Sequence, residues 1–251
     1  MTLKTNALAI NSLLITVTTS LITTMLHEGA HYVTARFMNI PASLHHNYVI
    51  TPDNTPLNTA TIISAAGPLF SLILGIISLV FSIRYDKISI LKLFTLWLGM
   101  QGILTFLGYI LIAPIAREGD TGKVFAYFGF PIYVSIGIAI ASFIYVNKLF
   151  SGFAKYFAYY KAGEFSTKNE DCRQLLIYPI FGSIILGTIL NLPVVIWVSL
   201  LPTIFMPMTY FATMGAYKGL KITNDQVIFS EIPMPLVVLT VVCVAVFRYL
   251  V

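Results

Sequence analysis

Long apolar stretches constrain this chain more than any other feature, because they predict helices that cross a lipid bilayer. A helix needs about 20 residues to cross about 30 Å of hydrocarbon. Hydrophobic residues make up 57% of the 251 positions and charged residues only 10%, whereas soluble domains carry roughly one quarter charged residues. We therefore predict an all-α, polytopic integral membrane protein with about six transmembrane helices: 8–30, 57–83, 88–113, 124–146, 175–214 and 235–250.

The connecting segments divide the chain into three parts. Residues 1–147 hold the first four apolar stretches. Residues 148–173 mix aromatic residues with lysines, which predicts either an interfacial helix lying flat on the membrane or a polar loop with aromatic anchors. Residues 174–251 are predicted to form additional C-terminal transmembrane helices. Internal prolines interrupt the stretch 175–214, so we expect a kinked helix with a re-entrant piece there, or two short spans.

The charge of the chain excludes one class of partner. The formal net charge is +5, and the basic residues are dispersed through the connecting segments instead of forming a block. Nucleic acid is therefore not an expected partner, whereas the anionic headgroups of a lipid bilayer are.

The first apolar stretch ends in an ionisable cluster, His27-Glu28-Gly29-Ala30-His31. Residues four apart lie on one face of a helix, so the two histidines can present two ring nitrogens to one metal ion. Glu28 sits about 100° around the helix from His27, within reach of a water molecule on that ion. A catalytic zinc ion requires neutral nitrogen ligands, an open position for water and a carboxylate that takes the proton of the attacking water.

A structural interpretation of the same cluster is packing or hydrogen bonding between helices. Ionisable groups inside a bilayer are costly, and they commonly serve function. The chain has only four histidines, and two of them flank Glu28 at helical spacing. We therefore favour metal binding over packing.

A catalytic zinc ion usually has three protein ligands, so one more ligand is expected. His45 and His46 are adjacent and point in different directions unless the backbone bends, which disfavours them. Most of the acidic residues lie in polar connections and are predicted to be solvated: Asp53, Asp86, Glu164, Glu170, Asp171, Asp225 and Glu231.

Glu118 and Asp120 remain, in the polar turn that precedes the fourth apolar stretch. If each of the first three stretches crosses the membrane once, the chain after the first stretch and the chain before the fourth lie on the same side. His31 and this turn can then meet at one depth. Either Glu118 or Asp120 is therefore a candidate for the third ligand.

Three segments together resemble the site-2 protease family of intramembrane zinc metalloproteases. HEGAHYVTARFMNI, from His27, is similar to the family's HExxH helix and the Ala-Arg that follows it. ISAAGPLFSLILG, from Ile63, resembles the Ala-Gly-Pro-Leu element of the next core helix. PIAREGDTGKVF, from Pro114, resembles the proline-led Leu-Asp-Gly segment. The three segments stand in the family's order and span about half of the chain.

The resemblance implies a three-helix metalloprotease core that binds one Zn²⁺ per chain. Its ligands would be His27, His31 and Asp120, with Glu28 as the general base. The implied substrate is a peptide bond in or near a transmembrane segment of another membrane protein.

Some positions depart from the family's pattern. Gly119 precedes Asp120 where the family favours Leu, and Thr121 follows it where Gly is usual. Many members carry an Asn after the Gly-Pro that helps to hold the substrate carbonyl, and this chain has Ser71 there. We therefore expect Ser71 and Gly67 to contact the substrate.

The segment 39–59 contains four Asn and three Pro, which predicts extended chain lying over the motif. We hypothesise that it offers a strand with which an unwound substrate pairs. Two other functions remain open: a membrane zincin with a Glu as third ligand, and a non-catalytic metal-binding membrane scaffold.

The two indications of membrane orientation disagree. Most Lys and Arg residues near the ends of the spans fall on the side away from the motifs, which puts the motifs toward the non-cytoplasmic face. The resemblance puts them nearer the cytoplasmic face.

Overall fold

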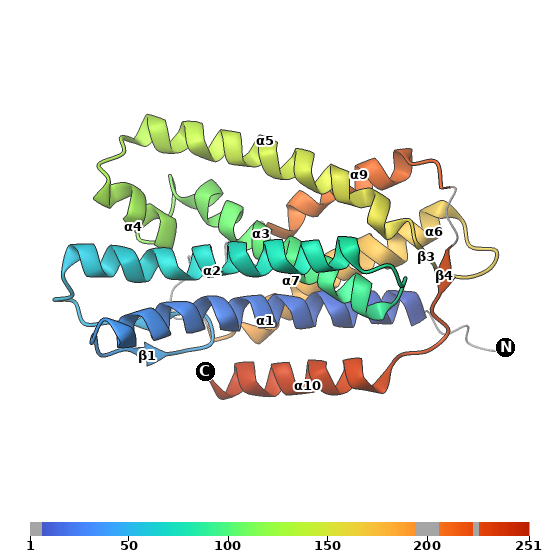
Figure 1. Ribbon diagram of the computed structural model, residues 1–251, viewed down its shortest axis with the longest axis horizontal. Coiled ribbons are helices and arrows are strands. Elements are labelled where there is room, and N and C mark those ends of the chain that lie inside the picture. The colour runs from blue at the N-terminus through green and yellow to red at the C-terminus, as the bar shows by residue number, and fades with distance from the viewer. Residues whose placement is uncertain (1–6, 194–205, 223–225, 251) are drawn as a thin grey trace.

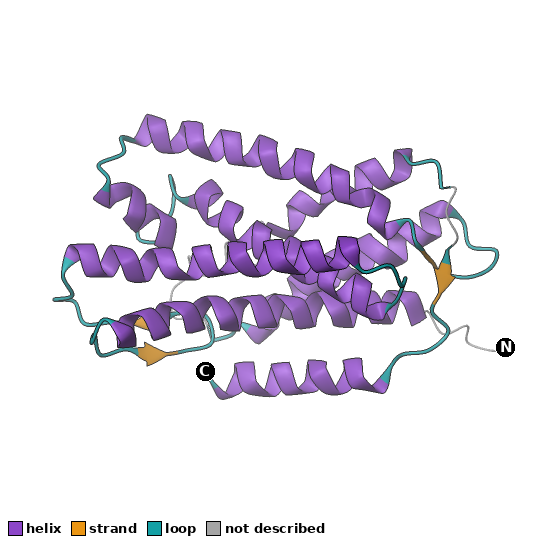
Figure 2. Ribbon diagram, viewed as in Figure 1, coloured by secondary structure: helices purple, strands orange, loops and turns teal. Residues whose placement is uncertain are grey.

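The computed structural model describes residues 7–193, 206–222 and 226–250, which form a bundle of helices (Figures 1 and 2). Among these residues, five helices are long and apolar enough to cross a membrane, as expected of an integral membrane protein. They are α1 (Ala7–Phe37), α2 (Leu57–Arg84), α3 (Ile90–Ile112), α5 (Ile132–Phe157) and the continuous helix Lys168–Leu190. The last comprises α6 (Lys168–Cys172), the π-helical turn η1 (Arg173–Ile177) and α7 (Tyr178–Leu190).

The remaining elements are shorter. They are α4 (Asp120–Tyr127), the 3₁₀ turn η3 (Met206–Tyr210), α9 (Phe211–Gly219), α10 (Met234–Tyr249) and the strands β1 (Ser43–Leu44), β2 (Val49–Ile50), β3 (Tyr160–Lys161) and β4 (Val227–Ile228). α10 has 16 residues, so it extends about 24 Å, less than the hydrocarbon core. Of the predicted stretch 175–214, residues 194–205 lie outside the described residues.

The fourth long helix starts later than the apolar pattern predicts. α4 ends where Gly129 adopts a left-handed φ of 67°, and Pro131 precedes the first residue of α5. Hydropathy does not detect this break, because the residues around it are apolar. As a consequence α5 extends into the segment 148–173, which therefore does not form a single interfacial helix. The rest of that segment contains β3, which pairs parallel to β4, and α6.

α1 is the central helix and contacts α2, α3, α7 and α10. α2 and α3 approach each other closely: a Cβ on Gly75 would lie 2.6 Å from the Ile103 nitrogen, and a Cβ on Gly102 would lie 2.7 Å from the Gly75 nitrogen. Small residues at such a crossing let two helix backbones pack directly. The C-terminal helices α7 and α10 thus pack against the central helix α1, as α2 and α3 also do.

The segment 39–59 forms a β-hairpin between α1 and α2. α1 ends at Phe37, and Asn39 then takes a left-handed φ of 59° that turns the chain back. β1 pairs antiparallel with β2, and both strands contact α1. The predicted extended chain is therefore a short hairpin beside the end of the HExxH helix (Figure 1).

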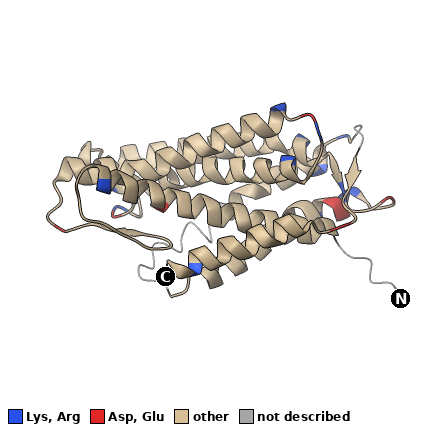
Figure 3. Ribbon diagram, turned by 60° about the horizontal axis from the view of Figure 1, so that its bottom comes forward, with Lys and Arg blue, Asp and Glu red and all other residues tan. Residues whose placement is uncertain are grey.

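Away from the HExxH motif, the bundle is held together by aromatic packing. Trp97 of α3 lies edge-on to Phe157 and Tyr210, with ring centroids 5.3 and 5.1 Å away. Phe150 of α5 stacks on Tyr210 at 5.3 Å, and all four side chains are fully buried. Charged residues lie mainly at the two ends of the bundle (Figure 3).

One acidic residue differs from its predicted solvated state. The side chain of Asp171 is buried and accepts hydrogen bonds from the Ala162 N–H at 2.8 Å and the Ser166 hydroxyl at 2.6 Å. These bonds close the loop between β3 and α6 and compensate the burial of the carboxylate. Asp225 lies outside the described residues.

Candidate metal centre

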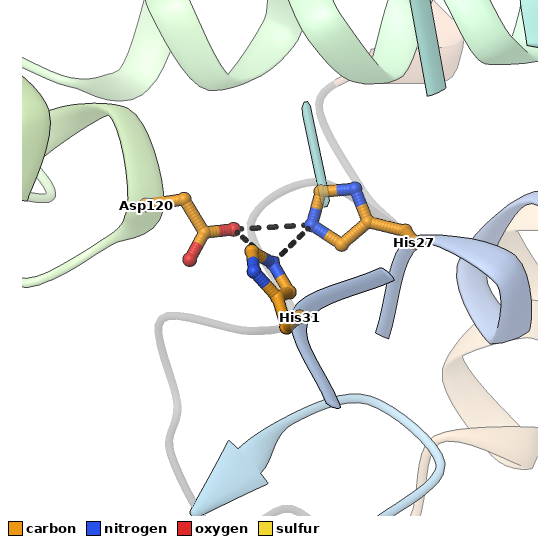
Figure 4. A group of neighbouring side chains, drawn as sticks. All are labelled: His27, His31 and Asp120. Carbon is orange, nitrogen blue, oxygen red and sulfur yellow. Dashed lines mark hydrogen bonds and ion pairs between the residues drawn. The ribbon is translucent and has the colours of Figure 1, made fainter. Parts of the chain in front are cut away.

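The two histidines of the HExxH motif and Asp120 converge on one point (Figure 4). His27 Nε2 and His31 Nε2 are 3.1 Å apart. Asp120 Oδ2 lies 3.1 Å from the first nitrogen and 3.2 Å from the second. The histidine side chains are buried in the bundle, and that of Asp120 is 22% exposed. α1 and α4 therefore bring Asp120 to two histidines that lie 93 and 89 positions before it in the chain.

The three atoms have the spacing of ligands around one zinc ion. Bonds of about 2.0–2.2 Å in a tetrahedral arrangement separate ligand atoms by about 3.3 Å. Acceptor atoms that face each other at this distance repel one another unless a cation lies among them. Imidazole nitrogen and carboxylate oxygen are also ligands that zinc takes in catalytic sites, with a fourth position left for water. The residues therefore fit a zinc ion.

Each histidine is oriented by a partner on its other ring nitrogen. His31 Nδ1 donates to the backbone carbonyl of Ile63 at 2.6 Å, and His27 Nδ1 lies 3.0 Å from the Ser71 hydroxyl. A carbonyl can only accept, so His31 carries its hydrogen on Nδ1 and keeps the Nε2 lone pair for a metal. Both partners belong to α2, so this helix sets the direction of both rings.

Gly67 allows α2 to come this close to the histidines. A Cβ at this position would lie 2.7 Å from His27 Nε2 and 2.6 Å from His31 Cε1. Real Cβ atoms are essentially never found at such distances from a neighbouring atom, so any other residue at position 67 would displace the imidazole rings. The Ala-Gly-Pro segment thus has a direct steric reason to contain glycine.

Asp120 is held in place by the turn that starts α4. It stands in the first turn of that helix, where a carboxylate interacts favourably with the helix dipole. Gly122 permits the turn to close, because a Cβ there would lie 2.7 Å from the Arg117 Cα.

Glu28 lines two cavities, of which one also borders His27 and the other His31 and Asp120. The larger cavity has a volume of about 230 Å³ and also borders His31, Asp120 and the hairpin residue Tyr48. The smaller cavity, of about 90 Å³, lies among α1, α3 and α7 and is lined mainly by hydroxyl and amide side chains. Polar cavities of this size hold water. A carboxylate in this position can accept a proton from a water molecule beside the ligand atoms.

Three other residues considered as ligands lie outside the group formed by His27, His31 and Asp120. Glu118 is exposed and borders the larger cavity, outside the group of three ligand atoms. His45 stacks on Tyr48 at 4.4 Å in the hairpin. His46 is buried against Phe247 of α10, with ring centroids 5.1 Å apart. Of the two candidates for the third ligand, the structure brings Asp120 to the histidines.

The two residues expected to contact the substrate both lie against the histidines, Ser71 at Nδ1 of His27 and Gly67 at the Nε2 atoms of both rings. Ser71 is fully buried, contacts His27 Nδ1, and borders neither cavity. Gly67 packs against the imidazole rings and borders neither cavity. In this structure both residues contact the histidines, and their contact with a substrate stays a prediction.

Tyr109 is a site residue that the sequence does not single out. Its ring stacks on the imidazole of His27, with centroids 4.9 Å apart and planes 11° apart, and it borders both cavities. It lies in an apolar stretch, and the chain has 13 other tyrosines elsewhere. No spacing or motif distinguishes it before α3 is placed beside α1.

No protein-family model, curated protein or solved structure matches the chain. The case for a functional site therefore depends on the side chains themselves.

Proposed function

We propose that this chain is an intramembrane zinc metalloprotease that hydrolyses a peptide bond in or near a transmembrane segment of a membrane-protein substrate. The observation that supports this most is the meeting of His27, His31 and Asp120 at zinc-ligand spacing, with Glu28 beside them at a cavity. The same residues stand in the three segments that resemble the site-2 protease family, so we propose membership of that family.

His27, His31 and Asp120 would hold one zinc ion. When bound, the zinc supplies a Lewis acid that lowers the pKa of a water molecule from 15.7 to about 7. Glu28 accepts a proton from that water. At the same time the oxygen of the water forms a bond to the carbonyl carbon of the substrate. The electron pair of the C=O double bond then moves to the carbonyl oxygen. When the C–N bond breaks, Glu28 delivers the proton to the leaving nitrogen.

The substrate helix must unwind before this attack, because its carbonyls are engaged in its own hydrogen bonds. Tyr48, Val49 and Thr51 of the hairpin border the larger cavity together with Glu28. A strand at this position can pair with an extended segment through main-chain hydrogen bonds. We therefore propose that β2 receives the unwound substrate.

The experiment that tests the function combines metal content with cleavage. Purified protein in detergent is expected to contain about one zinc per chain, and His31→Ala and Asp120→Ala to lose it. Glu118→Ala is the matched control for Asp120→Ala and should keep zinc. Loss of zinc in Glu118→Ala and retention in Asp120→Ala would instead support a zincin with a glutamate ligand.

Cleavage is then measured on a membrane-embedded model substrate. Glu28→Gln should keep zinc and reduce the rate by about 10²–10⁴-fold, because the general base is removed. A wild type that binds zinc but cleaves no faster than Glu28→Gln would favour the non-catalytic metal-binding scaffold.

A further inference from the structure

Hydrolysis of a peptide bond places negative charge on the carbonyl oxygen, and enzymes stabilise this charge with hydrogen-bond donors. The sequence resemblance suggests Ser71 for this role. Its hydroxyl, however, is fully buried and contacts His27 Nδ1, on the opposite side of the ring from the ligand atom Nε2. A donor for the substrate must therefore come from another element.

Tyr109 of α3 carries a hydroxyl and lies beside the candidate metal centre. Its ring is parallel to the imidazole of His27 at 4.9 Å, on a ring whose Nε2 is one of the three ligand atoms. It borders both the larger and the smaller cavity, as Glu28 does. The phenol therefore shares the space with the ligand atoms and the general base.

The Tyr109 hydroxyl also makes no hydrogen bond to any residue that the structure describes. A phenol inside a protein ordinarily finds a partner for its O–H. Tyr160 donates to the Ser89 carbonyl at 3.1 Å, whereas the hydroxyls of Tyr210 and Tyr217 also lack a partner but border neither cavity. The donor of Tyr109 is thus available to a molecule that enters the cavities beside Glu28.

We propose that Tyr109 is a catalytic residue whose hydroxyl donates a hydrogen bond to the carbonyl oxygen of the scissile peptide bond. The proposal rests on the protease function above. As the water oxygen bonds to the carbonyl carbon, the displaced electron pair resides on the carbonyl oxygen, and Glu28 holds the proton from the water. Tyr109 keeps its own proton throughout, so it stabilises the charge without taking part in proton transfer.

The stacked ring and the hydroxyl can be separated by two substitutions. Tyr109→Phe keeps the ring on His27 and removes only the donor, so we expect kcat to fall by about 10²–10³-fold with zinc content unchanged and KM changed little. Tyr109→Leu removes the ring as well and should also weaken zinc binding. Tyr160→Phe, which removes the hydroxyl of a tyrosine that borders neither cavity, is the control and should leave kcat near the wild-type value.

A binding measurement tests the same hydroxyl without turnover. A phosphinic peptide carries a tetrahedral group with a charged oxygen in place of the scissile carbonyl, and its affinity should fall in Tyr109→Phe by the same factor as kcat/KM. A reduced peptide with a CH₂–NH group lacks this oxygen and should bind both proteins equally.

The two proposals fail in different ways. If the wild type cleaves in a Glu28-dependent manner while Tyr109→Phe matches it in kcat and in phosphinic-peptide affinity, the role of Tyr109 is wrong and the protease function stands. If the wild type does not cleave, the protease function is wrong. Equal affinity of the phosphinic peptide for wild type and Tyr109→Phe would overturn the role of Tyr109 in that case also.

Discussion

The two ends of the helical bundle are held together by different interactions. Around Trp97, four large aromatic side chains pack against one another with no exposed surface. Around His27, ionisable side chains are buried, and each depends on one particular partner. Apolar packing tolerates many side chains of suitable volume, whereas buried polar groups need specific atoms at specific distances. The first end therefore contributes apolar packing, and the second holds the candidate metal site.

The largest expected effect at the aromatic end is on stability. Trp97→Ala removes a fully buried side chain and should lower the free energy of unfolding by about 3–5 kcal/mol. The ligand atoms are on other residues, so zinc per folded chain should stay at the wild-type value. Denaturant titration in detergent micelles and metal analysis of the folded fraction measure both quantities. Loss of zinc from folded Trp97→Ala would show that the two ends are coupled.

At the metal end, the expected effect is on zinc affinity. Gly67→Ala would place a methyl group against both imidazole rings, and a displaced ligand should weaken zinc binding by about 10–100-fold. Gly75→Ala on the same helix is the matched control, because its crowding is against Ile103 of α3. Competition with a zinc chelator should show reduced affinity in Gly67→Ala only. Equal affinities for the two variants would mean that α2 does not set the positions of the rings.

The smallest expected effect concerns the hairpin that joins the metal end to the C-terminal helices. The His46 N–H donates to the Leu250 carbonyl at 3.2 Å, and the His46 ring contacts Phe247. His46→Ala removes the ring contact and should speed amide hydrogen exchange of the hairpin a few-fold, because one side-chain contact contributes about 1 kcal/mol. His45→Ala alters the neighbouring residue, which contacts Tyr48 within the hairpin.

Hydrogen exchange read by mass spectrometry over residues 43–50 compares the two histidine variants. Faster exchange in His46→Ala than in His45→Ala would support anchoring of the hairpin by α10. Similar exchange in both variants would mean that the backbone bond to Leu250 is sufficient.

Much of the metal centre is predictable because its determinants are local. The spacing of His27 and His31 follows from helix geometry, and the two apolar stretches between them and Asp120 predict that these residues lie at the same end of the bundle. The preference for Asp120 over Glu118 is less predictable. These two residues are two positions apart, so both fit the order of the apolar stretches. Only the turn closed by Gly122 directs Asp120 to the histidines.

Other features depend on contacts between distant elements. The sequence pattern does not indicate that Ser71 faces His27 instead of a cavity, because that depends on how α2 is rotated against α1. Tyr109 is inconspicuous in a stretch of apolar residues until α3 lies beside α1. Similarly, the break at Gly129 lies within a continuous apolar pattern, and only the backbone conformation there separates α4 from α5.

The candidate ligands are divided between α1 and α4, so they are synthesised at different times. During synthesis, α1 enters the membrane first with His27, His31 and Glu28, while Asp120 is added only after α2 and α3 have been made. A nascent chain at that stage has two ligands, fewer than the three usual for a catalytic zinc ion. On the proposed function, a chain at this stage would lack a complete zinc site and would not yet cleave the membrane proteins inserted beside it. That site would be completed only when α4 folds against α1.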